Sequence, residues 1–137
     1  MIDTFRIKLL DIQPSQLFIS EAKLSKVREW LNEDHIEGYD PIPVKKLNGK
    51  VVFTDGHTRA YALHQLGVES LHVYWDNDNL DWEAYQICVA WCVEEGITNI
   101  SNLLHRVVEN NLYEELWLSR CKAMHSELEA SRKRIDK

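Results

Sequence analysis

The sequence is poor in residues that interrupt or cross-link a chain. It has 3 prolines, 5 glycines and 3 cysteines among 137 residues. Three cysteines cannot all pair, and no basic start with a long apolar run marks a secretion signal, so we expect reduced thiols in a cytoplasmic protein. The uncharged run around residues 85–93 is about half as long as a bilayer span, so we expect no membrane helix.

Positive charge is also scarce. The chain has 16 Lys and Arg against 22 Asp and Glu, a net charge of −6. An acidic chain repels polyanions, so we expect no binding to a nucleic-acid backbone unless positive charge gathers locally. A hydrophobic fraction of 45% and a charged fraction of 28% exclude a collagenous or wholly disordered chain. The length predicts one core with an appended segment.

The first half of the chain alternates strand patterns with helix patterns. Near-alternate apolar residues predict an initial strand, and Ser20 is a typical helix N-cap. Pro41 and Pro43 exclude a helix, whereas Asn48-Gly49 is a strong hairpin signal. The predicted elements are a strand over 2–12, a helix from Ser20 to about Gly38, a β-hairpin around Asn48-Gly49, a helix over 57–66 and a strand over 68–75.

The second half is predicted to be helical. From Asp81 onward there is no proline, and Gly96 is the only glycine. The helices are predicted over about 82–94, 99–109 and 112–130. The fold class is therefore predicted to be α+β, with a small mixed β-sheet and packed helices in residues 1–78 and a helical C-terminal extension in residues 79–137.

Two features of the helical half have alternative interpretations. Its first two helices have the order of a helix-turn-helix, but the second offers few basic or amide side chains, so DNA binding by this element is not expected. Cys88 and Cys92 lie four residues apart on one helix face, without a second Cys or His pair. This spacing predicts core packing rather than a zinc site.

The stretch Asp55-Gly56-His57-Thr58-Arg59 lies where a predicted strand turns into a helix. A helix start presents free N–H groups and a positive dipole end, which together favour an anion. A glycine lets phosphate approach the backbone, and the threonine and arginine side chains supply donors suited to phosphate oxygens. An ordinary helix with Asp55 as its cap and Arg59 in solvent explains the same residues equally well.

The predicted order of elements carries a resemblance to a known superfamily. With the pattern Gly56-x-x-Arg59-x-x-Ala62 and the following Leu66-Gly67, it resembles the ParB/sulfiredoxin superfamily over roughly residues 5–76. The resemblance implies that fold, and a nucleotide whose phosphates rest on the turn and the helix after it. The residues implied to bind the phosphates are Gly56, His57, Thr58 and Arg59.

Three branches of this superfamily differ at the turn. Sulfiredoxins carry their catalytic cysteine directly after the motif glycine, where this chain has His57, so sulfinic acid reduction is not expected. Partition proteins carry Gly-Glu-Arg-Arg, and this chain lacks that acidic residue and one arginine. Free-serine kinases carry Asp-Gly-His-His-Arg, which differs from this chain only at Thr58. The motif is therefore most similar to the kinase branch.

Similarity to the kinases implies roles for two carboxylates. Glu21 is the residue most similar to their base, and Asp55 is the candidate for holding Mg²⁺ through water. The implied ligands are ATP or ADP, Mg²⁺ and a small hydroxyl substrate. In a simpler interpretation, Glu21 only complements the helix dipole.

Two alternative functions remain open from the sequence. One is a non-catalytic ParB-like module that binds nucleotide or DNA in a regulatory or partition role. The other is an interaction protein whose helical half binds a partner. Neither the nucleotide base nor the oligomeric state follows from the sequence.

Overall fold

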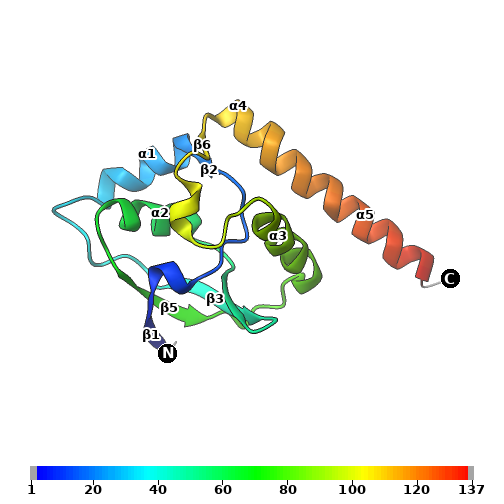
Figure 1. The fold of residues 1–137 in the computed structure, drawn as a ribbon, viewed down its shortest axis with the longest axis horizontal. Helices are drawn as coiled ribbons and strands as arrows, with labels where there is room; N and C mark the ends of the chain where they lie inside the picture. The colour runs from blue at the N-terminus through cyan, green and yellow to red at the C-terminus, as the bar shows by residue number, and fades with distance from the viewer. Residues whose placement is uncertain (1–2, 136–137) are drawn as a thin grey trace.

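The computed structural model describes residues 3–135 and confirms the α+β class, with a small mixed sheet and helices packed against it (Figure 1). The strands are β1 (Thr4–Lys8), β2 (Ile19–Ser20), β3 (Ile42–Leu47), β4 (Lys50–Phe53), β5 (Ser70–Trp75) and β6 (Val107–Val108). The α-helices are α1 (Glu21–Trp30), α2 (His57–Gln65), α3 (Trp82–Glu94), α4 (Asn110–Tyr113) and α5 (Ser119–Ile135). Two short 3-10 helices cover Leu9–Asp11 and Ile100–Leu103, and a π-helical stretch covers Glu114–Leu118.

The main sheet has the order β1-β5-β3-β4. β1 pairs antiparallel with β5, β5 pairs parallel with β3, and β3 and β4 form the predicted antiparallel hairpin. Leu71 and Val73 of β5 are fully buried, whereas the alternate residues Ser70, His72 and Tyr74 are partly exposed. This alternation arises because successive side chains of a strand point to opposite faces.

Helix α1 begins where the sequence predicts and ends earlier. The Lys23 N–H donates to the Ser20 side chain at 3.3 Å, so Ser20 is the N-cap. The predicted end near Gly38 is wrong, because α1 stops at Trp30. The Asn32 side chain accepts the Asp34 N–H at 3.0 Å, which stabilises a turn in place of another helical turn.

The predicted helix over 99–109 is also wrong. Only Ile100–Leu103 is helical, as a 3-10 turn, and Val107–Val108 forms β6, which pairs parallel with β2. β-branched valines favour such an extended segment, and the Ile19 N–H donates to the Arg106 carbonyl at 2.9 Å beside it. Within residues 3–135 no second α-helix therefore follows α3 in the arrangement of a helix-turn-helix.

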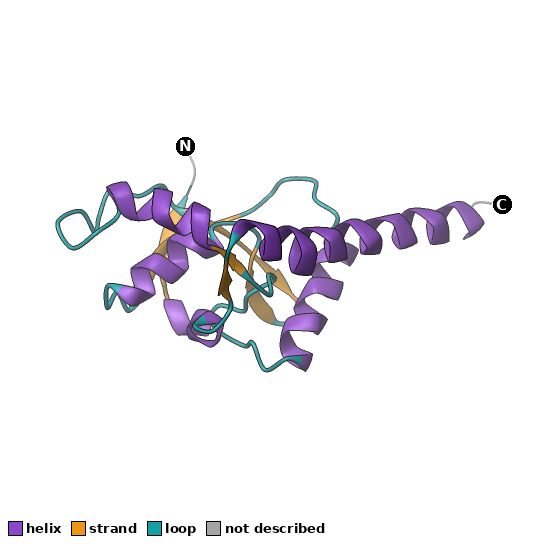
Figure 2. Ribbon diagram, turned by 90° about the horizontal axis from the view of Figure 1, so that it is seen from above, coloured by secondary structure: helices purple, strands orange, loops and turns teal. Residues whose placement is uncertain are grey.

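Residues before and after position 78 contribute to one buried cluster. It includes Leu9 and Leu63 from the first part and Ile97 and Leu103 from the second. The buried Gln13 side chain also donates to the Ile97 carbonyl at 2.8 Å. Helix α5 packs on this core with its first half and then extends beyond the body of the molecule (Figures 1 and 2). No helix within residues 3–135 is both long and apolar enough to span a membrane.

Two adjacent leucines test how far the two parts depend on each other. Leu103 is fully buried, so Leu103→Ala should lower the free energy of unfolding by about 2–5 kcal/mol in urea titrations. Leu104 is 53% exposed, and Leu104→Ala should change the free energy of unfolding by less than about 0.5 kcal/mol. In the Leu103 variant, the α2 amides should lose protection from hydrogen exchange by an amount that matches the loss in the free energy of unfolding. Unchanged protection in α2 would show instead that residues 1–78 fold independently.

A candidate anion-binding site at the start of helix α2

The turn between β4 and α2 depends on Gly56. Its φ of +79° lies in the left-handed region, and a Cβ at this position would meet the Ile42 side chain at 3.0 Å. Gly56 is the N-cap of α2, and Asp55 does not cap the helix, because its carboxylate accepts the N–H of Gly56 itself at 2.8 Å. The first turn of α2 therefore has no side-chain cap. Its N–H groups remain available to an acceptor from outside the helix.

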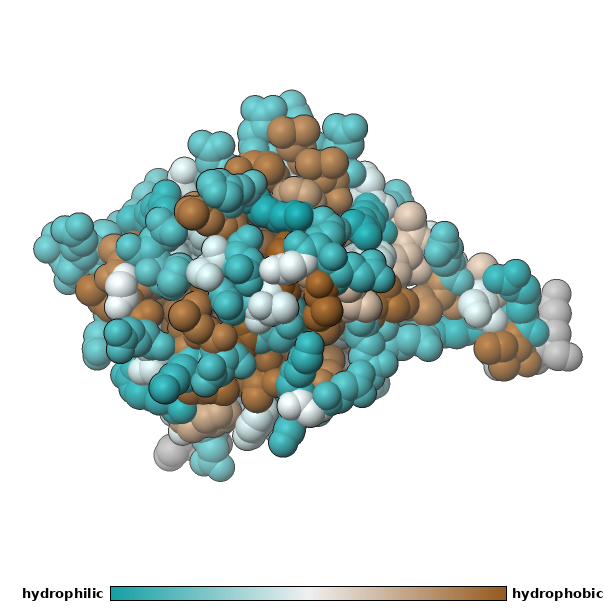
Figure 3. Space-filling model, in the orientation of Figure 1, coloured by the Kyte–Doolittle hydropathy of each residue, from teal (hydrophilic) through white to brown (hydrophobic). Residues whose placement is uncertain are grey.

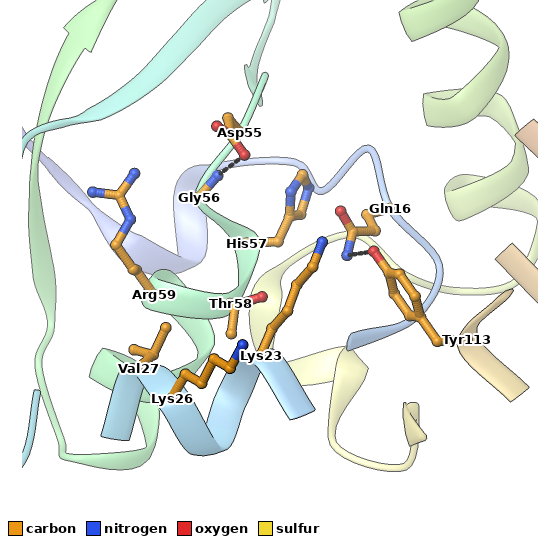
Figure 4. A pocket seen from close by; sticks show the side chains of 10 residues that line it. All are labelled: Gln16, Lys23, Lys26, Val27, Asp55, Gly56, His57, Thr58, Arg59 and Tyr113. Atoms are coloured by element: carbon orange, nitrogen blue, oxygen red, sulfur yellow. Dashed lines mark hydrogen bonds between the residues drawn. The ribbon is translucent and has the colours of Figure 1, made fainter. Parts of the chain in front are cut away.

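A cavity of about 350 Å³ opens against this turn (Figure 4). Five of the six residues assigned from the sequence line it: Asp55, Gly56, His57, Thr58 and Arg59. The rest of its wall comes from other elements: Gln16, Lys23, Lys26 and Val27 of the N-terminal half, and Tyr113 of α4. The structure thus brings the two halves of the chain together at one site.

Glu21 is not among the residues that line the cavity. Its side chain is exposed at the first position of α1. Lys23 lies two residues later, and residues two apart in a helix point to nearly opposite sides. Because α1 turns Lys23 toward α2, Glu21 is directed away from the turn.

Three cations surround the cavity. Lys26 reaches from α1 toward Thr58, the Lys23 amine lies over the Tyr113 ring at 5.4 Å from its centroid, and Arg59 lies on the other side of the turn (Figure 4). None of the three forms a salt bridge within residues 3–135. Asp55 is the only acidic residue among the described residues of the wall. In a chain of net charge −6, this local excess of positive charge favours an anion.

Further hydrogen-bond donors are available in the wall. Burial raises the pKa of Tyr113 to about 12, so its hydroxyl stays protonated at neutral pH. That hydroxyl accepts a hydrogen bond from Gln16 at 3.0 Å, which leaves its own hydrogen free to donate. The Arg59 guanidinium donates to the Asp40 carbonyl at 2.8 Å and keeps further N–H groups.

His57 has a structural partner. It is only 4% exposed, and its Nε2 accepts the backbone N–H of Ser15 at 2.9 Å. Burial lowers the pKa of His57 to about 4, against the opposing effect of Asp55. The imidazole is therefore neutral at pH 7, with its proton on Nδ1, and brings no positive charge to an anion. The resemblance implies a phosphate contact for His57, whereas its bond to Ser15 holds the turn.

The residues present fit a Mg²⁺ ion carried by phosphate. Asp55 uses Oδ1 for the Gly56 N–H, and its other oxygen is available to a water ligand of the ion. Mg²⁺ bound with nucleotides needs only one or two carboxylates. No group of three or more His, Cys, Asp or Glu residues suited to a metal occurs within residues 3–135.

The sequence motif around Gly56 does not indicate the two lysines of this site. Lys23 and Lys26 are three residues apart, which places them on one helix face. That spacing is the one feature of the sequence that indicates a shared positive helix face. It does not reveal which element this face meets, because the contact between α1 and α2 depends on the tertiary fold.

Comparison with solved structures finds partial similarities. Protein Atu1540 from Agrobacterium tumefaciens is 17% identical, with a TM-score of 0.46 over 72% of this chain and 51% of its own. The chain thus spans about half the length of that protein. Sulfiredoxin from Arabidopsis thaliana is 15% identical, with a TM-score of 0.47 over 64% of this chain and 97% of its own. No family model and no curated protein matches the sequence. At these identities and scores, the function has to be argued from this chain's own residues.

The buried imidazole predicts a pH dependence of stability. Below pH 6.5 the unfolded chain binds a proton on His57, whereas the native state does not until about pH 4. Stability should therefore fall as the pH drops through this window, by up to about 3 kcal/mol from this group. We expect His57→Gln to flatten the pH dependence of urea unfolding between pH 6.5 and 5. The exposed control, His105→Gln, should retain the wild-type slope. Equal slopes in all three proteins would contradict the assignment.

Proposed function

We propose that the protein binds a nucleoside di- or triphosphate, ATP or ADP in the first instance, together with Mg²⁺. The observation that carries this proposal is the gathering of Lys23, Lys26 and Arg59, none of which forms a salt bridge within residues 3–135, around the uncapped start of α2. A polyphosphate supplies several negative charges at short spacing, which suits three cations around one turn. A cavity of about 350 Å³ is at the lower end for small-molecule sites. It suits the phosphates, with the nucleoside extending out.

Each side chain then has a defined role. The N–H groups of the first turn of α2 and the Thr58 hydroxyl donate to phosphate oxygens. Lys23 and Lys26 neutralise phosphate charge from the α1 side of the cavity, and Arg59 neutralises it from the opposite side of the turn. Asp55 holds Mg²⁺ through water, and the ion neutralises part of the phosphate charge. The similarity of the motif to that of the free-serine kinases supports the same arrangement.

Phosphotransfer to a small hydroxyl substrate is the finer form of this proposal. It needs a base near the substrate hydroxyl, and the resemblance to the kinases implies that role for Glu21. The position of Glu21 outside the cavity favours the second candidate, a non-catalytic nucleotide-binding module with a regulatory role. A Mg²⁺-dependent turnover assay with ATP or ADP and a set of small hydroxyl compounds separates the two.

Charge variants test the binding site. Lys23→Ala and Lys26→Ala should each weaken ATP binding by about 10- to 100-fold in titration calorimetry, the range for a hydrogen bond to a charged group. Lys50→Ala removes the same charge from an exposed position outside the cavity and should leave the affinity nearly unchanged. Equal affinities for all three variants would place the nucleotide elsewhere, and no binding by the wild type would reject the proposal.

Glu21→Gln tests the catalytic form. Because Glu21 lies outside the cavity, we expect the nucleotide affinity to be unchanged. If the protein transfers phosphate with Glu21 as base, turnover should fall by about 10²- to 10⁴-fold. If transfer occurs with equal rates in both proteins, another group is the base. A comparable loss of affinity would show instead that Glu21 supports the pocket.

A further inference from the structure

A second cavity, also of about 350 Å³, lies between α3, α5 and the turn that precedes α2. It shares Asp55, His57 and Gln16 with the first cavity. Its far wall carries two thiols from different helices, Cys88 of α3 and Cys121 of α5. The sequence predicts core packing for Cys88 and gives no reason to connect it with Cys121.

The packing of α3 against α5 holds these two thiols opposite each other. On one side of them, Trp91 and Trp117 pack edge to face with their ring centroids 6.1 Å apart. On the other side, Arg132 pairs with Asp81 at 2.9 Å. The cysteines lie between these two contacts, so the helices cannot separate at the thiols without breaking one of them. Both side chains line the same cavity, which brings the two thiols together from α3 and α5.

The pKa values of the three cysteine thiols are shifted in different directions or to different extents. The neighbouring Cys88 thiol and Arg120 lower the pKa of Cys121 against the opposing effect of burial, and Cys121 is also partly exposed. The neighbouring Cys121 thiol and burial raise the pKa of Cys88. Cys92 is fully buried, and burial raises its pKa to about 12. Cys121 is therefore the expected nucleophile, because the thiolate is the reactive form.

We propose that Cys88 and Cys121 form a site of reversible oxidation, in which a peroxide converts the thiol pair into a disulfide between α3 and α5. In the first step the Cys121 thiolate attacks hydrogen peroxide. The S–O bond forms, the O–O bond breaks and hydroxide leaves, which takes up a proton to become water. In the second step the Cys88 sulfur attacks the sulfenic acid of Cys121. The S–S bond forms, the S–O bond breaks, and the Cys88 proton leaves with hydroxide as a second water.

The geometry favours closure of this disulfide within one chain. A disulfide requires sulfurs about 2.05 Å apart on closely spaced backbones, and the packing of α3 against α5 brings the two thiols to one cavity, where side-chain rotation can close the bond. The cavity gives a small oxidant access to both sulfurs. This proposal does not depend on nucleotide binding.

The experiment treats the full-length protein with a small excess of hydrogen peroxide. We expect the intact mass to fall by about 2 Da, the loss of two hydrogens in one disulfide. A non-reducing peptide map should link the Cys88 and Cys121 peptides, and dithiothreitol should reverse the link. Cys92→Ser, which removes a thiol one helical turn from Cys88, is the matched control and should keep the disulfide. Cys88→Ser and Cys121→Ser should each abolish it.

A second measurement does not depend on the stability of any variant. In the wild type, iodoacetamide should label Cys121 about 10-fold faster or more than Cys92 at pH 7.5, because the Cys121 thiol ionises more easily. Equal labelling rates would overturn the assignment of Cys121 as the nucleophile. A wild-type protein that gains oxygen at its cysteines without the Cys88–Cys121 link, or that links Cys92 instead, would overturn the proposal.

Discussion

The hydrogen bond between the buried Ser15 amide and the His57 imidazole fixes the turn on which the candidate site depends. The segment before Ser15 pairs with β4, where Gln13 donates to Val51 and accepts from Phe53. The bond thus joins two stretches of chain at the start of α2. An amide left without an acceptor there would cost about 1–3 kcal/mol, and a protonated imidazole offers no acceptor. The fold therefore requires a neutral histidine, and the charge for binding an anion has to come from other residues.

The distribution of ion pairs matches this requirement. The arginines that pack along α3 and α5 have acidic partners: Arg106 and Arg120 share Glu95, and Arg132 pairs with Asp81 and Glu83. The cations around the start of α2 have none within residues 3–135. Mutual repulsion disfavours such a group in the free protein, and a bound anion removes that cost. Apolar and polar side chains are interspersed over the face shown in Figure 3.

Local patterns predicted what local physics determines. Ser20, Asn48-Gly49 and Gly67 marked a cap, a hairpin and a helix end, and α3 has the predicted bounds. One error is local, because the Asn32 side chain ends α1 early, and the other falls where tertiary contacts decide. Residues 99–109 have helical spacing of apolar side chains, yet Val107 pairs with Ile19 of a strand far away in the sequence. The motif at Gly56 indicated where the site lies, but the lysines of α1 enter it only through the packing of α1 against α2.

The positions of the carboxylates decide whether the proposed site could catalyse phosphate transfer in addition to binding a nucleotide. A base has to come within hydrogen-bond reach of the attacking hydroxyl, directly or through one water. Glu21 lies on the far side of α1, and bringing it to the cavity by rotating the helix would turn Lys23 away. Asp55 borders both cavities, but in the proposed arrangement it is engaged with Mg²⁺ through water and leaves the role of base unfilled. Transfer therefore requires α1 to shift along its axis rather than rotate, or a substrate that enters from the Glu21 side. Without such a change, the proposed site would bind phosphate without transferring it.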